Sequence, residues 1–189
     1  VYEHGTDELL ADCRSANGIH ITNAKQLFEF LSGIMSDFAA RNKRKKELMA
    51  QGCDENELFA KMQSFKPYFI FINDINGFFN DVYFPGEGVG AMSGFVENII
   101  EKGASHNFYF FAASDSEKSF DVSGTKAYSS FIGYKKGVLL GGCINTQQTF
   151  SFRNMTYSEQ SRPEKRGIGI TPTYEDESVA EKIVIPVGR

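Results

Sequence analysis

Apolar side chains recur at helical spacing in the first half of the chain. Between Asn23 and Met49 they form a single stripe at i, i+3, i+4, i+7, i+8 and i+11, made by Leu27, Phe30, Leu31, Ile34, Met35 and Phe38. Asn23 suits the N-cap of this helix, and Gly52 suits its end. The sequence further predicts a short helix from Asp54 to about Gln63, with Asp54 and Glu57 as a capping-box-like start, and a helix over 93–102 that ends at Gly103.

Short apolar runs between these helices predict strands. Tyr68–Ile72 is bounded by Pro67 and by Asn73-Asp74, and its continuous apolar character predicts a strand buried on both faces. Further strands are predicted at 108–113, 137–140 and 182–187, and surface loops at 114–126 and 157–178. Because strands alternate with helices, the expected fold class is α/β, with a mostly parallel, doubly wound sheet flanked by helices. Val1-Tyr2 reads as the end of a strand, so we expect the sequence to begin inside a fold.

The composition of the chain limits the classes of function that it can have. The chain has 189 residues, 41% of them hydrophobic, and a net charge of −4, which suits one domain or two small ones and argues against nucleic-acid binding. The three cysteines and three histidines are dispersed without metal-ligand spacing, so we expect a reduced setting and no metal site of these residues. No apolar run approaches the roughly 18 residues that a membrane span needs.

The most informative motif is the predicted strand Tyr68–Ile72 with the Asn73-Asp74 that follows it. A hydrophobic strand that ends in two acidic residues is the Walker B arrangement, in which the first acid holds Mg²⁺ and the second polarises the attacking water. Here the first position is the neutral Asn73, and Asp74 is the candidate catalytic acid. Ser114 follows the second buried strand, where a polar sensor of the γ-phosphate would lie. The alternative is that Asn73 and Asp74 only close the strand or cap a helix.

The run from Tyr68 to Phe78 resembles the Walker B segment of the last ATPase module of EssC-type proteins, the FtsK/SpoIIIE-like motors of type VII secretion systems. Gly137–Gly142, Tyr157–Pro163, Gly167–Gly169 and Ile183–Pro186 are similar to the C-terminal end of the same family. The resemblance spans nearly the whole chain, and it implies that residues 1–189 form one RecA-like P-loop NTPase module. It also implies a cytosolic domain of a bacterial membrane protein, which meets the membrane only through other parts of that protein. Its partners would be neighbouring ATPase modules and secreted WXG100-type helical proteins.

Two features depart from an active ATPase. The chain contains no GxxxxGK[ST] phosphate loop, so the first strand and this loop would have to lie upstream of Val1. Asn73 brings no negative charge, and Mg²⁺ prefers carboxylate oxygens. We therefore expect a degenerate module that recognises substrates or regulates export, with weak or absent ATP/Mg²⁺ binding at Asn73, Asp74 and Ser114. The alternative is an active ATP-hydrolysing motor module whose phosphate loop lies upstream.

Three further features have more than one interpretation. The basic run 41–46 is expected to be a solvated helix end, although it could contact nucleic acid, acidic lipid or the acidic run 175–177; an arginine finger from this run, Arg153 or Arg162 is also conceivable. Gly86, Gly88 and Gly90 are expected to form a flexible loop between the Walker-B-like strand and the next helix rather than a phosphate loop. The aromatic cluster Phe78, Phe79, Tyr83 and Phe84 is either a satellite core or an exposed docking patch for a helix.

Overall fold

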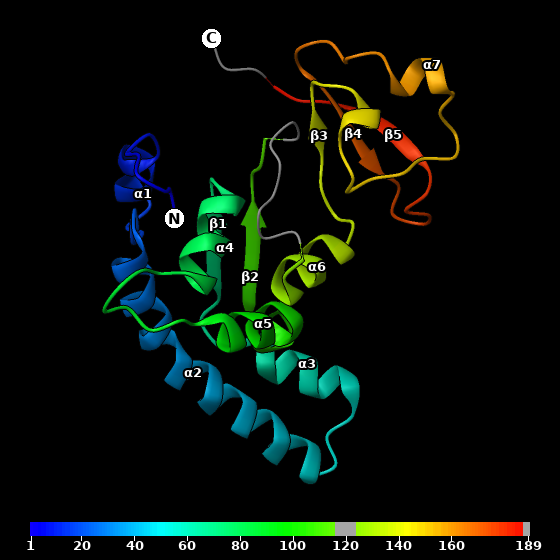
Figure 1. Cartoon of the computed structure of the whole chain (residues 1–189). Helices are drawn as coiled ribbons and strands as arrows, with labels where there is room; N and C mark the ends of the chain where they lie inside the picture. Colours follow the sequence, from blue (N-terminus) through cyan, green and yellow to red (C-terminus); the bar gives the residue numbers. More distant parts are fainter. Residues whose placement is uncertain (116–123, 187–189) are drawn as a thin grey trace. The chain divides into compact units, whose positions relative to one another are not determined.

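The structure is a computed structural model that describes residues 1–115 and 124–186. Its contacts divide the chain into two compact units (Figure 1). The first unit comprises Val1–Ser114 with Phe120–Phe131, and the second comprises Asp115–Ser119 with Ile132–Arg189. Each unit carries a β-sheet of its own.

The first unit is mostly helical. Its elements are α1 (Leu10–Ser15), α2 (Ala24–Ala50), α3 (Glu55–Gln63), β1 (Tyr68–Ile72), α4 (Ile75–Tyr83), α5 (Ser93–Lys102), the 3₁₀ helix η1 (Gly103–His106), β2 (Phe108–Ala112) and the start of α6 (Lys126–Gly133). The helices predicted between Asn23 and Met49, from Asp54 to about Gln63 and over 93–102 are confirmed as α2, α3 and α5. The predicted loop at 114–126 falls mainly on residues outside those that the structure describes.

The ends of α2 and α3 follow their capping residues. Asn23 Oδ1 accepts a hydrogen bond from the Gln26 amide at 3.1 Å, and Asp54 Oδ1 accepts one from the Glu57 amide at 2.9 Å. At the end of α2, Gly52 has a φ of +81°, and the amides of Gly52 and Cys53 donate to the carbonyls of Met49 and Leu48. This is the Schellman arrangement, which glycine allows because it has no Cβ to clash at positive φ.

Strands β1 and β2 form a parallel two-stranded sheet, and they lie side by side in Figure 1. Ile72 is in register with Ala112, and Tyr2 bridges in parallel to both Ile72 and Ile21. The prediction that β1 and β2 are buried on both faces is wrong. Ile70, Ile72 and Phe108 point into the core, whereas Phe69, Phe71 and Phe111 are 56%, 47% and 49% exposed. Side chains alternate along a strand, so one face of this sheet is open.

The buried face of the sheet packs against the long helix α2 and against α4. The Phe38 ring of α2 meets the Phe108 ring edge-on at 5.6 Å, and the Phe78 ring of α4 meets Tyr2 edge-on at 5.4 Å. Phe78 and Phe79 are 1% and 0% exposed, whereas Phe84 is 66% exposed. The aromatic cluster of α4 is therefore core at these two positions, and the interpretation of the whole cluster as a docking patch is wrong.

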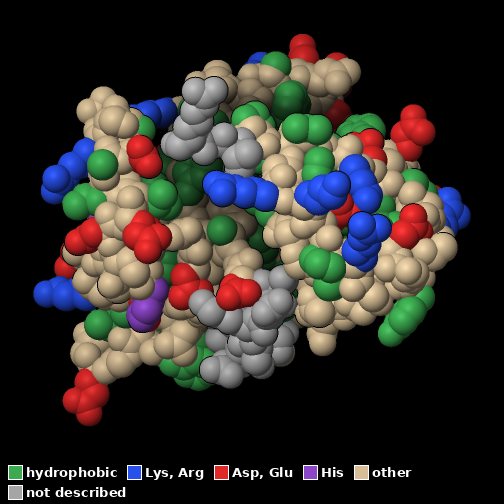
Figure 2. Space-filling view, turned by 90° about the horizontal axis from the view of Figure 1, so that it is seen from above, with side chains coloured by type: hydrophobic (Ala, Val, Ile, Leu, Met, Phe, Trp, Pro, Cys, Tyr) green, Lys and Arg blue, Asp and Glu red, His purple; other side chains and the backbone are tan. Residues whose placement is uncertain are grey.

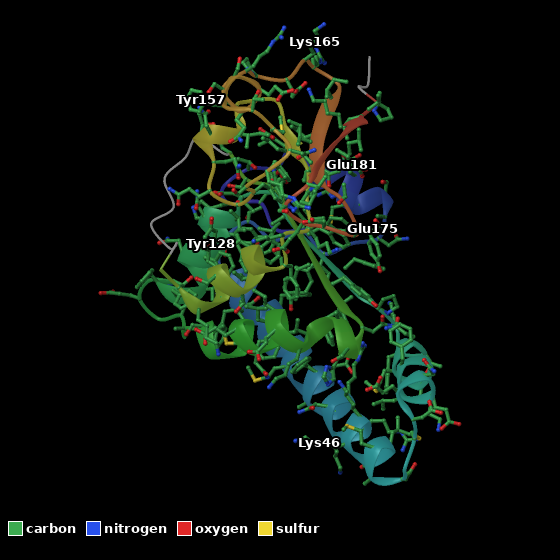
Figure 3. All side chains as sticks on the ribbon, turned by 90° about the vertical axis from the view of Figure 1, so that its right-hand side faces the viewer. Lys46, Tyr128, Tyr157, Lys165, Glu175 and Glu181 are labelled. Atoms are coloured by element: carbon green, nitrogen blue, oxygen red, sulfur yellow. The ribbon has the colours of Figure 1, made fainter. Side chains whose placement is uncertain are left out.

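The expectation that the basic run 41–46 is solvated is wrong at Arg41, which is 3% exposed. Its guanidinium donates to the carbonyls of His106 and Lys66 at 2.8 Å each and to Asp37 at 2.9 Å. It also lies over the aromatic rings of Phe65, Tyr68 and Phe108. By contrast, Lys46 is exposed near the end of α2, where Figure 3 shows it extending away from the helix.

The second unit contains a separate, antiparallel sheet. It is formed by β3 (Leu139–Leu140), β4 (Ile168–Pro172) and β5 (Ala180–Val184) in the order β3-β4-β5, and it is accompanied by η2 (Ile144–Thr146) and α7 (Tyr157–Gln160). Its small core is made by Leu139, Ile144, Phe152 and Ile170. The prediction of one mostly parallel sheet is therefore wrong for this part of the chain. The predicted loop at 157–178 is also wrong, because it contains α7 and β4.

Charge is mixed on the one face of the molecule that Figure 2 draws. On this face, acidic and basic side chains are interspersed among the coloured residues.

Among the described residues, no helix combines the length and the apolar character that crossing a bilayer requires.

Candidate functional site at the end of β1

The candidate residues of the Walker-B-like motif meet at one edge of the first unit. Because β1 and β2 are parallel and Ile72 pairs with Ala112, the residues that follow the two strands emerge at the same edge. The Ala113 amide donates to the Ile72 carbonyl at 2.8 Å, which extends the pairing to the start of this edge. The structure thus brings Asn73 and Asp74 to the edge where Ser114 lies. Ligands of parallel sheets bind at this carboxyl edge.

Asp74 is the N-cap of α4. Its Oδ1 accepts a hydrogen bond from the Asn76 amide at 3.0 Å, and its backbone is extended. An acid at this position satisfies a free amide of the first turn and complements the helix dipole. The side chain also lies close to Gly77, where an added Cβ would be 2.7 Å from both Asp74 Oδ2 and His4 Cβ. The capping interpretation of Asp74 is therefore what its contacts show.

The Asn73 side chain is hydrogen-bonded to a carboxylate that the sequence analysis did not single out. Its Nδ2 donates to Oε1 of Glu3 at 3.2 Å, and Glu3 is 0% exposed. The Glu3 carboxylate also accepts from the Leu9 amide at 2.9 Å and lies 2.7 Å from His20 Nε2. Burial alone would raise the pKa of Glu3, but these hydrogen bonds outweigh it and hold the pKa below its ordinary value.

A second polar group flanks this pair. The Tyr2 hydroxyl donates to Asp81 Oδ2 at 2.8 Å, and His4 Nδ1 lies 3.4 Å from the same oxygen. Burial, together with the bond to Asp81, raises the pKa of Tyr2 well above its ordinary value. Tyr2, Glu3 and His4 therefore attach the beginning of the chain to β1 and α4. We call the segment Tyr2–His4 the N-terminal latch.

The edge by itself offers few ligands for a magnesium ion. Asn73 presents an amide whose NH₂ group is bonded to Glu3, and one oxygen of Asp74 is bonded to α4. Within residues 1–115 and 124–186, no group of three or more His, Cys, Asp or Glu side chains could hold a metal ion. Mg²⁺ requires several oxygen ligands in near-octahedral geometry. The Mg²⁺ of a nucleotide bound here would take most of its ligands from phosphate oxygens and water.

The other candidate residues lie elsewhere. Arg153 forms an ion pair with Asp176, and Lys135 forms one with Glu177, both inside the second unit. The acidic run 175–177 thus has basic partners of its own unit. The glycines 86, 88 and 90 lie in a loop before α5, but α4, which was not predicted, separates this loop from β1; φ is +86° at Gly86 and +77° at Gly88. In the same unit as Arg153, Tyr157 and Lys165 are exposed (Figure 3).

Sequence reasoning missed Glu3, His20 and Asp81. The sequence did carry one signal for Glu3, because this residue directly follows Tyr2, which was predicted to end a strand. Because Ile21 pairs with Tyr2, His20 is brought next to Glu3, which lies 17 residues before it in the chain. This pairing has no local signature.

No protein-family profile and no curated protein matches this chain. Two solved structures do match over 98% of it. One is the cytoplasmic domain of EssC, with 14% sequence identity and a TM-score of 0.66, and the other is EssC (ATPases 2 and 3) from Geobacillus thermodenitrificans, with 18% and 0.62. The chain spans 33% and 30% of their lengths. At this identity the likeness establishes a shared fold.

Proposed function

We propose that this chain is a degenerate ATPase-fold module of a type VII secretion motor, of the EssC type, which recognises substrates or regulates export with weak or no ATP hydrolysis. The shared fold with the EssC structures over 98% of the chain supports the ATPase-module part of the proposal. We also propose that the chain has a RecA-like P-loop fold and that a single module includes both units.

The observation that carries the degenerate role is the bonding of Asn73 and Asp74. A Walker B site needs a carboxylate that holds hydrated Mg²⁺ and a second that activates water. Here the first is replaced by an amide bonded to Glu3, and the second caps α4. Both side chains thus have structural partners in the first unit, which supports a module with weak or no hydrolysis.

The test is a calorimetric titration of the chain with MgATP, accompanied by an assay of phosphate release. We expect no binding heat at millimolar MgATP and no turnover. Micromolar affinity that is lost in Asp74→Ala, together with turnover, would contradict the degenerate role. Because the phosphate loop of an active module would precede Val1, the same titration should be repeated on a longer polypeptide that includes upstream residues.

A second candidate function is an active motor module with an upstream phosphate loop. One observation favours it: Ser114 and Asp74 emerge from neighbouring parallel strands, which is where a γ-phosphate sensor and a Walker B acid belong. In this case Asp74→Asn would abolish turnover while leaving the N-cap intact, since Asn also caps helices well.

The proposed role also names partners and a location. The module would act beside neighbouring ATPase modules, in a cytoplasmic domain of a bacterial membrane protein, and would bind secreted WXG100-type helical proteins. Fluorescence anisotropy with labelled C-terminal segments of such proteins tests this part. Saturable binding supports substrate recognition, and its absence at high micromolar chain concentration leaves regulation as the role.

A further inference from the structure

The buried Glu3 carboxylate lies within hydrogen-bond distance of the residue 73 side chain. Glu3 is fully buried, and its Oε1 takes the hydrogen bond of the Asn73 amide group at 3.2 Å. Its Oε2 is occupied by the Leu9 amide and by His20. We propose that Glu3 is a positioning residue of this site: its carboxylate requires a hydrogen-bond donor at position 73, and therefore excludes the acid that a magnesium site would place there.

The argument depends on charge at close range. Residue 73 is exposed on its outer side, and an aspartate in the conformation of Asn73 would bring a second carboxylate to about 3 Å from Glu3 Oε1. Ionising both carboxylates at this separation is costly. The groups that face Glu3 are Thr6, the Leu9 amide, His20 and residue 73. Of these, His20 can carry positive charge, and it lies on the far oxygen of Glu3, next to Asp7. It therefore does not separate Glu3 from residue 73.

The same geometry predicts a compensating pair of substitutions, Glu3→Gln with Asn73→Asp. In this double variant the amide carbonyl introduced at position 3 can accept from the Leu9 amide and His20, while the new NH₂ group donates to the carboxylate at position 73. The hydrogen bond between positions 3 and 73 is kept with its direction reversed, and the number of charges is unchanged. The metal-site part of this inference rests on the proposed function, whereas the pairing itself does not.

The experiment is a double-mutant cycle in the whole chain without nucleotide, followed by thermal and urea unfolding at pH 8. We expect Asn73→Asp to lower the unfolding midpoint by about 5 °C or more. The double variant should recover at least half of that loss. Asn80→Asp, which adds the same charge at an exposed position of α4, is the matched control and should change the midpoint by about 1 °C at most.

The pH profile separates this role from a general packing effect. In Asn73→Asp the paired carboxylates raise one folded-state pKa above its unfolded value, so the variant should regain stability relative to the wild type as pH falls from 8 to 5. In the wild type the pKa of Glu3 is lowered, and its contribution is lost only as pH falls below about 4.5, through the folded-state pKa. The double variant should lack the regain between pH 8 and 5.

Three results would overturn the proposal: an Asn73→Asp midpoint equal to that of the Asn80→Asp control, a double variant no more stable than Asn73→Asp, or a double variant that does not fold. None of them depends on ATP. A chain that binds MgATP tightly would overturn the proposed function while leaving the cycle unaffected, so the two failures are distinguishable.

Discussion

At the scale of single residues, the side chains that the sequence marks as surface or catalytic are occupied in holding the fold together. Arg41 lies in a basic run but is buried, with three oxygen acceptors and three aromatic rings around its guanidinium. Asp74 lies in a catalytic pattern but caps a helix. Arg41 takes its role from partners in other segments, whereas Asp74 caps the helix that directly follows it.

Arg41→Ala should lower the free energy of unfolding by about 3–4 kcal/mol, because it removes a buried cation and leaves Asp37 and two carbonyls without their donor. Arg41→Lys should recover only part of this loss, since an ammonium cannot reproduce the planar fork of donors. Urea denaturation measures both. Arg44→Ala, which removes an exposed pair with Glu47, is the control and should cost about 0.5 kcal/mol at most. Equal costs at positions 41 and 44 would refute the structural role of Arg41.

At the scale of elements, the close approach of the N-terminal latch to α4 depends on a glycine. Helical glycine normally costs about 1 kcal/mol relative to alanine. Gly77 lies in the first turn of α4, where a Cβ would meet Asp74 Oδ2 and His4 Cβ, both at 2.7 Å. The N-terminal latch and Asp74 therefore leave too little room for a side chain at position 77 of α4.

Gly77→Ala should destabilise the chain by about 1–3 kcal/mol, against the helix propensity, because the latch must shift away from α4. Gly33→Ala provides the matched control in α2, where nothing lies within 4 Å of the added Cβ, and it should stabilise by up to about 1 kcal/mol. Denaturation curves of the two variants should thus move in opposite directions. A shift of both toward higher stability would show that the latch does not constrain α4.

At the scale of the whole molecule, a parallel sheet with one open face is unusual, because such sheets are normally covered on both faces. The aromatic sheet face is formed by Phe69, Phe71, Tyr109 and Phe111, whose rings contact one another across β1 and β2. Their exposure leaves an apolar area on the surface of the first unit.

Phe71→Thr should therefore change the free energy of unfolding by less than about 1 kcal/mol, whereas Ile72→Thr, one residue along and 2% exposed, should cost about 2–4 kcal/mol. Threonine keeps the strand propensity in both variants. Chemical denaturation gives the two values, and binding of an apolar dye should fall in Phe71→Thr. Comparable costs at both positions would mean that the aromatic sheet face is covered in solution.

Local sequence signals are sufficient to place most elements of the first unit. Periodicity and capping residues predict α2, α3, α5, β1 and β2 within a residue or two, because these signals act between neighbours in the chain. The sequence also establishes that position 73 is an amide and that no phosphate loop lies between Val1 and Arg189. Strand β4 was not predicted, because it lies in a polar, glycine-containing stretch with a weak local preference for strand structure. Its pairing with β3 and β5 overrides that preference.

What these elements face, and which groups meet, depends on tertiary packing. Continuous apolar runs predict burial on both faces, but the open side of β1 and β2 depends on which elements pack there. The pairing of Tyr2 with Ile21 and Ile72 brings Glu3, His20 and Asn73 together from three segments. Contacts between residues far apart in the chain are set by packing and hydrogen bonding in three dimensions. For that reason the carboxylate behind Asn73 could not be predicted from the motif that contains it.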